Sequence, residues 1–164
     1  MPAPMPKPLL LLDIGGVICT QGSPDSVDFV EIAGATRALA PAIEERLHDL
    51  LAHFELAWAS AWGDEANVEL GPRLGLPALE HVRFLEEDEF GASYKLAGVR
   101  AFVGERPAAW VDDDLGADCR EWARGRKQPT LLVETDAQVG LTGEDVEELL
   151  SFGQGPGSPS QIQG

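Results

Sequence analysis

Polar residues that can bind a metal ion or take part in catalysis occur in this sequence where short apolar runs end. Asp13 follows "LLLL", Ser60 follows "LAWA", and three consecutive aspartates, residues 112–114, follow "AAWV". Three neighbouring carboxylates repel one another unless a cation lies near them. Mg²⁺ takes oxygen ligands such as these carboxylates. The pattern therefore indicates a divalent cation site to which distant parts of the chain contribute.

A parallel sheet is the arrangement that would bring these residues together. Apolar runs alternate with helical patterns, which favours a doubly wound, Rossmann-like α/β fold with three α/β/α layers. In such sheets ligands bind beyond the carboxyl ends of the strands, so the polar residues should converge in one cleft. Strands are predicted over residues 8–14, 55–60, 107–114 and 129–135, and helices over 41–54, 63–75, 95–104, 116–126 and 142–152. The last of these helices opens with Thr142 and Asp145, three residues apart, a spacing typical of a capping box.

Length and terminal composition predict one folded domain. The 164 residues suit a single domain, and 44% hydrophobic residues are enough to build a core. Residues 8–152 are the expected HAD-like α/β domain discussed below. Residues 1–7 contain three prolines and are expected to be flexible, and residues 153–164 form a Gly, Pro, Ser and Gln tail that is expected to be disordered.

Charge and cysteine content limit the classes of partner. Twelve basic and 28 acidic residues give a net charge of −16, which argues against binding nucleic acid phosphates. No apolar run reaches the roughly 18 residues of a membrane span, and the N-terminus lacks signal-peptide features, so we expect a cytoplasmic protein. Cys19 and Cys119 have no C-x-x-C spacing and are expected to be reduced thiols, although the sequence leaves one disulfide between them open. The sequence does not indicate an oligomeric state.

Four motifs in order resemble the haloacid dehalogenase (HAD) superfamily, a large group of phosphohydrolases that use an aspartate nucleophile. These are Asp13 in "LLDIGGV", Ser60 in "LAWAS", Lys95 in "YKLAGV", and "WVDDD" at residues 110–114. The resemblance covers roughly residues 8–150, nearly the whole of the expected domain. It implies a Mg²⁺-dependent hydrolase that forms an aspartyl-phosphate on Asp13.

The resemblance also implies a role for each of these residues. Asp13 would attack phosphorus, which divides one difficult step into two easier ones. Ser60 would donate a hydrogen bond to a phosphoryl oxygen, and Lys95 would neutralise charge on the nucleophile and the phosphate. Ser60 also fits a helix N-cap, and Lys95 an ordinary surface lysine. The Mg²⁺ ligands would be Asp13, the backbone carbonyl of Gly15 and Asp112, with Asp113 as a further ligand or a group that orients water.

Gly15 departs from the pattern of the superfamily. Most HAD phosphatases have Asp-x-Asp at the first motif, where the second aspartate is the general acid and base. Glycine cannot transfer a proton, and such help is worth roughly 10²–10⁴ in rate. Three explanations are open: slow turnover or a substrate with a good leaving group; an acid supplied by Asp25 or Asp28; or a domain without turnover that binds a ligand or a partner.

The segments between the motifs leave the site open. Neither the stretch from Asp13 to Ser60 nor that from Ser60 to Lys95 is long enough for an extra domain, so no large cap domain is expected. An open site admits a phosphorylated or other small-molecule substrate, including a larger one. The acidic stretch "EEDEF" is expected to be a solvated loop. A two-component receiver domain also combines acidic residues, Ser and Lys, but it places its acidic pair first, whereas here the cluster comes last.

Overall fold

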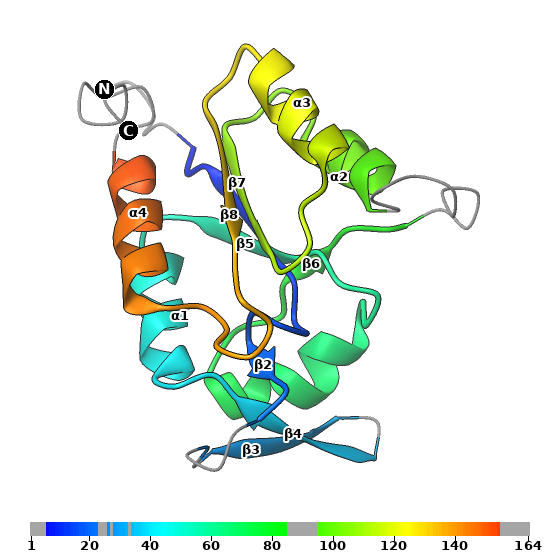
Figure 1. Ribbon diagram of the computed structural model, residues 1–164, viewed down its shortest axis with the longest axis vertical. Coiled ribbons are helices and arrows are strands. Elements are labelled where there is room, and N and C mark those ends of the chain that lie inside the picture. The colour runs from blue at the N-terminus through cyan, green and yellow to red at the C-terminus, as the bar shows by residue number, and fades with distance from the viewer. Residues whose placement is uncertain (1–5, 23–25, 27, 33, 85–94, 155–164) are drawn as a thin grey trace.

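A five-stranded parallel sheet forms the centre of the protein (Figure 1). The structure, a computed structural model, describes residues 6–22, 26, 28–32, 34–84 and 95–154. The strand order is β6-β5-β1-β7-β8, and every neighbouring pair is parallel. The strands are β1 (Leu9–Leu12), β5 (Glu55–Trp58), β6 (Glu80–His81), β7 (Ala108–Asp112) and β8 (Thr130–Glu134).

Helices cover both faces of this sheet. Helices α1 (Ile43–Leu51) and α4 (Gly143–Gln154) lie against one face, and α2 (Leu96–Val103) and α3 (Ala117–Gly125) lie against the other (Figure 1). The α/β fold with a parallel sheet between helices, expected from the alternating apolar runs, is therefore confirmed, and it is compatible with a Rossmann-like fold.

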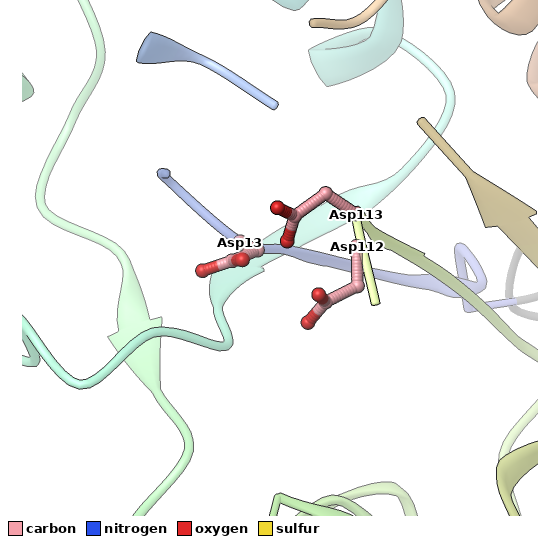
Figure 2. A group of neighbouring side chains, drawn as sticks. All are labelled: Asp13, Asp112 and Asp113. Carbon is pink, nitrogen blue, oxygen red and sulfur yellow. The ribbon is translucent and has the colours of Figure 1, made fainter. Parts of the chain in front are cut away.

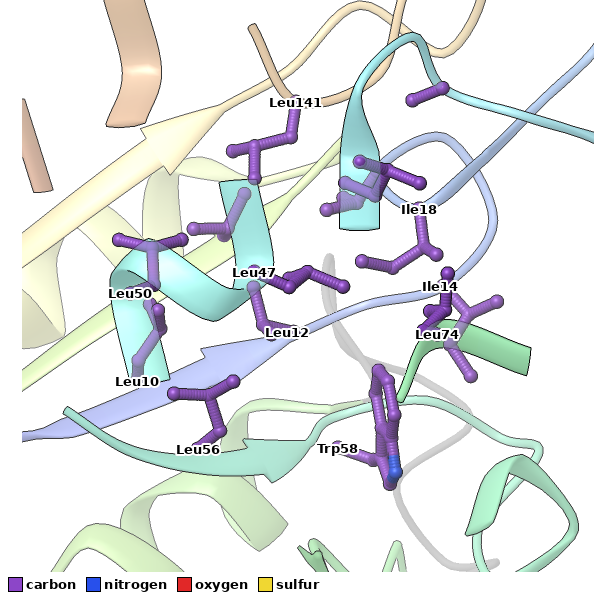
Figure 3. Packing of buried hydrophobic residues seen from close by; sticks show 14 of the residues in the cluster. Leu10, Leu12, Ile14, Ile18, Leu47, Leu50, Leu56, Trp58, Leu74 and Leu141 are labelled. Carbon is purple, nitrogen blue, oxygen red and sulfur yellow. The ribbon is translucent and has the colours of Figure 1, made fainter. Parts of the chain in front are cut away.

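The four leucines of β1 divide between two hydrophobic cores. Successive side chains of a strand point to opposite faces. Leu10 and Leu12 pack in the core that includes Leu47 of α1 and Leu149 of α4, part of which Figure 3 shows. The alternate leucines, 9 and 11, pack in the second core with Val99 of α2. A continuous apolar run is thus required here, because neither face of the central strand meets water.

A small antiparallel sheet lies beyond the carboxyl ends of the central strands (Figure 1). It consists of β2 (Cys19–Thr20), β4 (Ala35–Leu39) and β3 (Phe29–Ile32) in the order β2-β4-β3. No strands were predicted between Asp13 and the first helix. Exposed and buried residues alternate in β3, but its sequence "FVEI" does not alternate between polar and apolar residues and so gives no periodic strand signal.

The single helix predicted over residues 63–75 is wrong. The chain instead forms a π-helix over Ala66–Leu70 and a 3₁₀ turn over Pro72–Leu74. Pro72 has no N–H to continue an α-helix, and Gly75, with φ of 69°, ends the turn. The backbone N–H of Gly71 donates to the carbonyl of Ala66 at 2.8 Å, which gives the wider π turn.

The other predicted elements differ only at their ends. The capping box is present: the backbone N–H of Thr142 donates to Asp145 Oδ2 at 3.0 Å, and that of Asp145 donates to Thr142 Oγ1 at 3.1 Å. Helix α4 continues to Gln154, two residues past the expected domain end.

"EEDEF", Asp25 and residues 155–164 lie outside the described residues. Cys19 and Cys119, the two cysteines of the chain, are both buried thiols. Among the described segments, every helix is too short or too polar to cross a bilayer.

Candidate functional site

Three carboxylates come together because the strands that carry them are neighbours. β1 and β7 run parallel and in register, and the backbone N–H of Asp13 continues the pairing by donating to the carbonyl of Val111 at 3.0 Å. Asp112 is the last residue of β7, and Asp113 follows it. One carboxylate oxygen from each of the three aspartates lies within 4.8 Å of the others (Figure 2). The sequence prediction that these residues meet at one edge of the sheet is borne out geometrically.

Lys95 joins this cluster from the start of α2. Its ammonium lies 3.1 Å from Asp13 Oδ1 and 2.8 Å from Asp112 Oδ2, and it also donates to the carbonyl of Ala59 at 3.0 Å. Its side chain is only 10% exposed, so it is not an ordinary surface lysine. All three ammonium protons therefore have acceptors, and the two carboxylates share one positive charge.

The charges in the site alter one another's pKa values. Burial, with a smaller contribution from Asp112, raises the pKa of Asp13 to about 7, although Lys95 and a 2.8 Å hydrogen bond from the N–H of Ile14 oppose the rise. Burial would lower the pKa of Lys95, but the two carboxylates outweigh it and the pKa is raised. Burial and the neighbouring Asp112 raise the pKa of Asp113. One lysine thus leaves the cluster with excess negative charge when all three carboxyl groups are ionised.

The donor set fits a hard divalent cation. Three carboxylate oxygens within 4.8 Å of one another are the kind of ligand that Mg²⁺ takes. A cation held by them would also lower the raised carboxyl pKa values of Asp13 and Asp113. Asp114 is exposed, and its backbone N–H donates to Asp112 Oδ1 at 3.0 Å. It therefore contributes to the cluster through the backbone, by holding the Asp112 carboxylate in place.

The two glycines after Ile14 differ in what they permit. Gly16 has φ of +81°, and a Cβ there would lie 2.5 Å from Asp113 Oδ2, so this position requires glycine. Gly15 is exposed, and a Cβ there would meet nothing within 4 Å. The surroundings of Gly15 therefore leave room for a side chain that the sequence does not supply. That the Gly15 carbonyl is a metal ligand stays a prediction.

Ser60 lies at the same edge of the sheet, just past β5. It is buried, and its Oγ accepts a hydrogen bond from the backbone N–H of Trp62 at 3.2 Å. It directly follows Ala59, whose carbonyl binds Lys95. A serine oxygen that accepts from an N–H can still donate its own proton to another acceptor. The hydroxyl therefore holds the turn after β5 and keeps a donor.

Thr135 is a site residue that the sequence interpretation missed. It is buried at the end of β8, and its Oγ1 donates to the carbonyl of Gly16 at 2.7 Å. Its backbone N–H donates to the carbonyl of Asp112 at 3.0 Å. Thr135 thus ties the glycine turn to the strand end that carries the carboxylates. A polar residue closing the run "PTLLVE" is the same signal that singled out Asp13.

Asp28, one of the two suggested substitutes for the missing acid, has another partner. Its Oδ1 lies 3.9 Å from one guanidinium nitrogen of Arg73. The other terminal nitrogen of the same guanidinium lies 3.9 Å from a carboxylate oxygen of Glu44. These residues line a hollow of about 230 Å³ between the small sheet and α1. Asp28 is not among the described carboxylates that group with Asp13.

The fold and the site together define a parallel α/β protein with a carboxylate and ammonium cluster at the carboxyl edge of its sheet. Comparison with known proteins finds neither a protein-family model nor a curated protein that matches this chain. The chemistry of the cluster is therefore the basis for assigning a function.

Proposed function

We propose that this protein is a Mg²⁺-dependent hydrolase of the HAD type that acts on phosphate esters through an aspartyl-phosphate on Asp13. The observation that carries the proposal is the shared ion pair: Asp13 and Asp112, at the ends of adjacent parallel strands, both contact the ammonium of Lys95. Phosphoryl transfer depends mainly on positioning and on stabilising charge, and this cluster offers both at the edge where α/β proteins bind ligands.

Asp13 is the proposed nucleophile. Its carboxylate oxygen would attack phosphorus while the bond to the leaving oxygen breaks, and water would then cleave the aspartyl-phosphate to give phosphate and the free carboxylate. The side chains of Asp13, Asp112 and Asp113, with the carbonyl of Gly15, would hold Mg²⁺. When bound, Mg²⁺ supplies positive charge that offsets the repulsion between a carboxylate and a phosphate dianion.

Lys95 and Ser60 are the proposed stabilising groups. The ammonium of Lys95 lies 3.1 Å from Asp13 Oδ1, where it favours the ionised form that attacks. Its position is fixed by the carbonyl of Ala59 and by Asp112, so little reorganisation is needed during the reaction. Ser60 would donate its hydroxyl proton to a phosphoryl oxygen.

Gly15 favours a second candidate function, a domain that binds a phosphorylated ligand or a partner with little or no turnover. Without a carboxylate two residues after Asp13, no group there can protonate a leaving oxygen, which forfeits roughly 10²–10⁴ in rate. Hydrolysis would then be measurable mainly for esters whose leaving group needs no proton.

Hydrolysis of p-nitrophenyl phosphate, whose leaving group meets that condition, tests the proposal. We expect turnover with Mg²⁺, none with EDTA, and loss to background in Asp13→Asn. Asp49→Asn is the matched control, because this exposed aspartate of α1 lies outside the carboxylate cluster. A Gly15→Asp variant should raise turnover of alkyl phosphates, since the position has room for the side chain. If a broad panel of phosphate esters gives no turnover while Mg²⁺ still binds, the binding function replaces the hydrolase.

A further inference from the structure

Arg37 lies over the ring of Trp62, in the segment that follows β5. Its guanidinium carbon is 5.1 Å from the centroid of Trp62. Trp62 follows β5, and its backbone N–H donates to Ser60 Oγ at 3.2 Å. Ser60 in turn follows Ala59, whose carbonyl binds Lys95. The guanidinium of Arg37 is therefore linked to Lys95 through two contacts of the chain segment from Ala59 to Trp62. Arg37 lies over the ring at one end of this segment, and Lys95 donates to the carbonyl at the other end.

The backbone of Arg37 reaches the same edge of the sheet by a second route. Arg37 belongs to β4, which pairs with β2 through Cys19 and Leu39. The backbone N–H of Gly16, in the turn that follows Asp13, donates to the carbonyl of Cys19 at 2.7 Å. Arg37 thus contacts the segment after β5 and belongs to a sheet that is bonded to the segment after β1. The first of these segments begins at Ala59, whose carbonyl accepts from Lys95, and the second begins at Asp13.

Arg37 is an exposed residue. In a chain with 28 acidic residues, no carboxylate in the described ranges forms an ion pair with it, whereas Arg73, Arg106 and Arg120 each have one. Trp62 packs against the main core, so the ring is a firm support for the guanidinium. A guanidinium held over an aromatic ring through its charge can still use its N–H donors, whose forked arrangement matches a planar carboxylate. In an acidic protein a singly charged carboxylate is also repelled less than a phosphate dianion.

We propose that Arg37, supported by Trp62, binds a carboxylate of the substrate, so that the preferred substrates are phosphate esters that carry a carboxylate away from the reacting phosphate. This inference rests on the proposed hydrolase function and specifies its substrate class. Arg37 selects the substrate and takes no part in the attack on phosphorus.

Two esters of the same shape that differ in one charge test this specificity. We compare kcat/KM for 4-carboxyphenyl phosphate with that for 4-carbamoylphenyl phosphate in Mg²⁺. The wild type should prefer the carboxylate, and Arg37→Met should reduce the preference about fivefold or more, because one charge-assisted hydrogen-bonded pair is lost at an exposed position. Trp62→Leu should reduce it in the same direction. Arg124→Met, an exposed arginine in the last turn of α3, is the matched control and should leave the ratio unchanged.

A merely structural role for Arg37 predicts a different result. If the arginine only fastens the small sheet to the segment after β5, Arg37→Met lowers the two kcat/KM values by the same factor, and that outcome overturns the proposal. Turnover of both esters with an unchanged ratio would still leave the hydrolase function standing.

Binding of non-hydrolysable analogues separates this inference from the proposed hydrolysis. Calorimetry in Mg²⁺ would compare 4-carboxyphenylphosphonate with 4-carbamoylphenylphosphonate. Tighter binding of the carboxylate that is lost in Arg37→Met supports the assignment even if neither ester is hydrolysed. Equal affinities, or no binding of either phosphonate, refute it.

Discussion

Replacing Lys95 with methionine is the sharpest test of the cluster. The ammonium is within 3.1 Å of Asp13 and 2.8 Å of Asp112, and the side chains of these aspartates are 11% and 3% exposed. Lys95→Met keeps a long apolar side chain but leaves buried carboxylates without their counter-charge. Breaking a buried ion pair by removing one partner costs about 3–5 kcal/mol of the free energy of unfolding. With a urea m-value of about 2 kcal/mol/M, the midpoint should fall by about 1.5–2.5 M.

The pH decides how much of this loss is visible. The pKa of Asp13 is raised from 3.8 to about 7 in the folded state, so its neutral form favours folding below pH 3.8 and this contribution is lost as the pH rises to about 7. At pH 8 both Asp13 and its partner Asp112 need the ammonium, whereas at pH 5 Asp13 is mostly protonated. The difference between wild type and Lys95→Met, measured by circular dichroism in urea with EDTA, should therefore be larger at pH 8.

Mg²⁺ and a second substitution give independent checks. Added Mg²⁺ should stabilise Lys95→Met more than the wild type, since the cation takes over the role of the ammonium. Lys95→Met combined with Asp112→Asn should be more stable than Lys95→Met alone, because one uncompensated charge is gone. Lys127→Met, at an exposed lysine, should change stability by no more than about 0.5 kcal/mol. A loss below about 1 kcal/mol for Lys95→Met at pH 8 in EDTA would refute the reasoning.

Other parts of the site give further expectations. Gly16→Ala should lose at least about 2 kcal/mol in urea unfolding and bind Mg²⁺ more weakly, because φ is +81° and the new Cβ would lie 2.5 Å from a carboxylate oxygen, whereas Gly15→Ala should be nearly neutral. Thr135→Val should lose about 1–3 kcal/mol by leaving a buried carbonyl without its donor, and Thr135→Ser should recover most of that loss; equal losses would contradict a role for the hydroxyl. Burial raises the pKa of the Cys19 thiol to about 11, so at pH 8 native protein should react with a thiol reagent at neither Cys19 nor Cys119, and unfolded protein at both.

The parts of the fold that the sequence predicted are those with strong local patterns. Continuous apolar runs identified β1, β5, β7 and β8, and the rule for ligand sites in parallel sheets placed Asp13 near Asp112. Lys95 could be placed only through the family resemblance. The residues next to Lys95 in the sequence do not indicate that the lysine side chain is buried between carboxylates that come from two strands.

The parts that were missed depend on contacts between distant residues. β2 has two residues, too few for any periodicity, and it exists because it pairs with β4. Thr135 contacts Gly16, 119 positions away, and only the finished sheet brings them together. The helix predicted over residues 63–75 had suitable composition, but Pro72 cannot supply the N–H that an uninterrupted helix needs.

The uniform composition of β1 has a consequence for how its alignment in the sheet is determined. Because all four residues are leucine, sliding the strand by one position would leave leucines facing both cores, and packing alone would distinguish the two alignments poorly. The same slide would move Asp13 by about 3.3 Å, away from Lys95 and from the carbonyl of Val111. The contacts of Asp13, the charged residue at its end, therefore favour the observed alignment of the central strand. A deletion of one leucine that keeps Asp13 in place would draw Pro8 into the strand, where it has no N–H to replace the hydrogen bond from Leu9 to the carbonyl of Pro107.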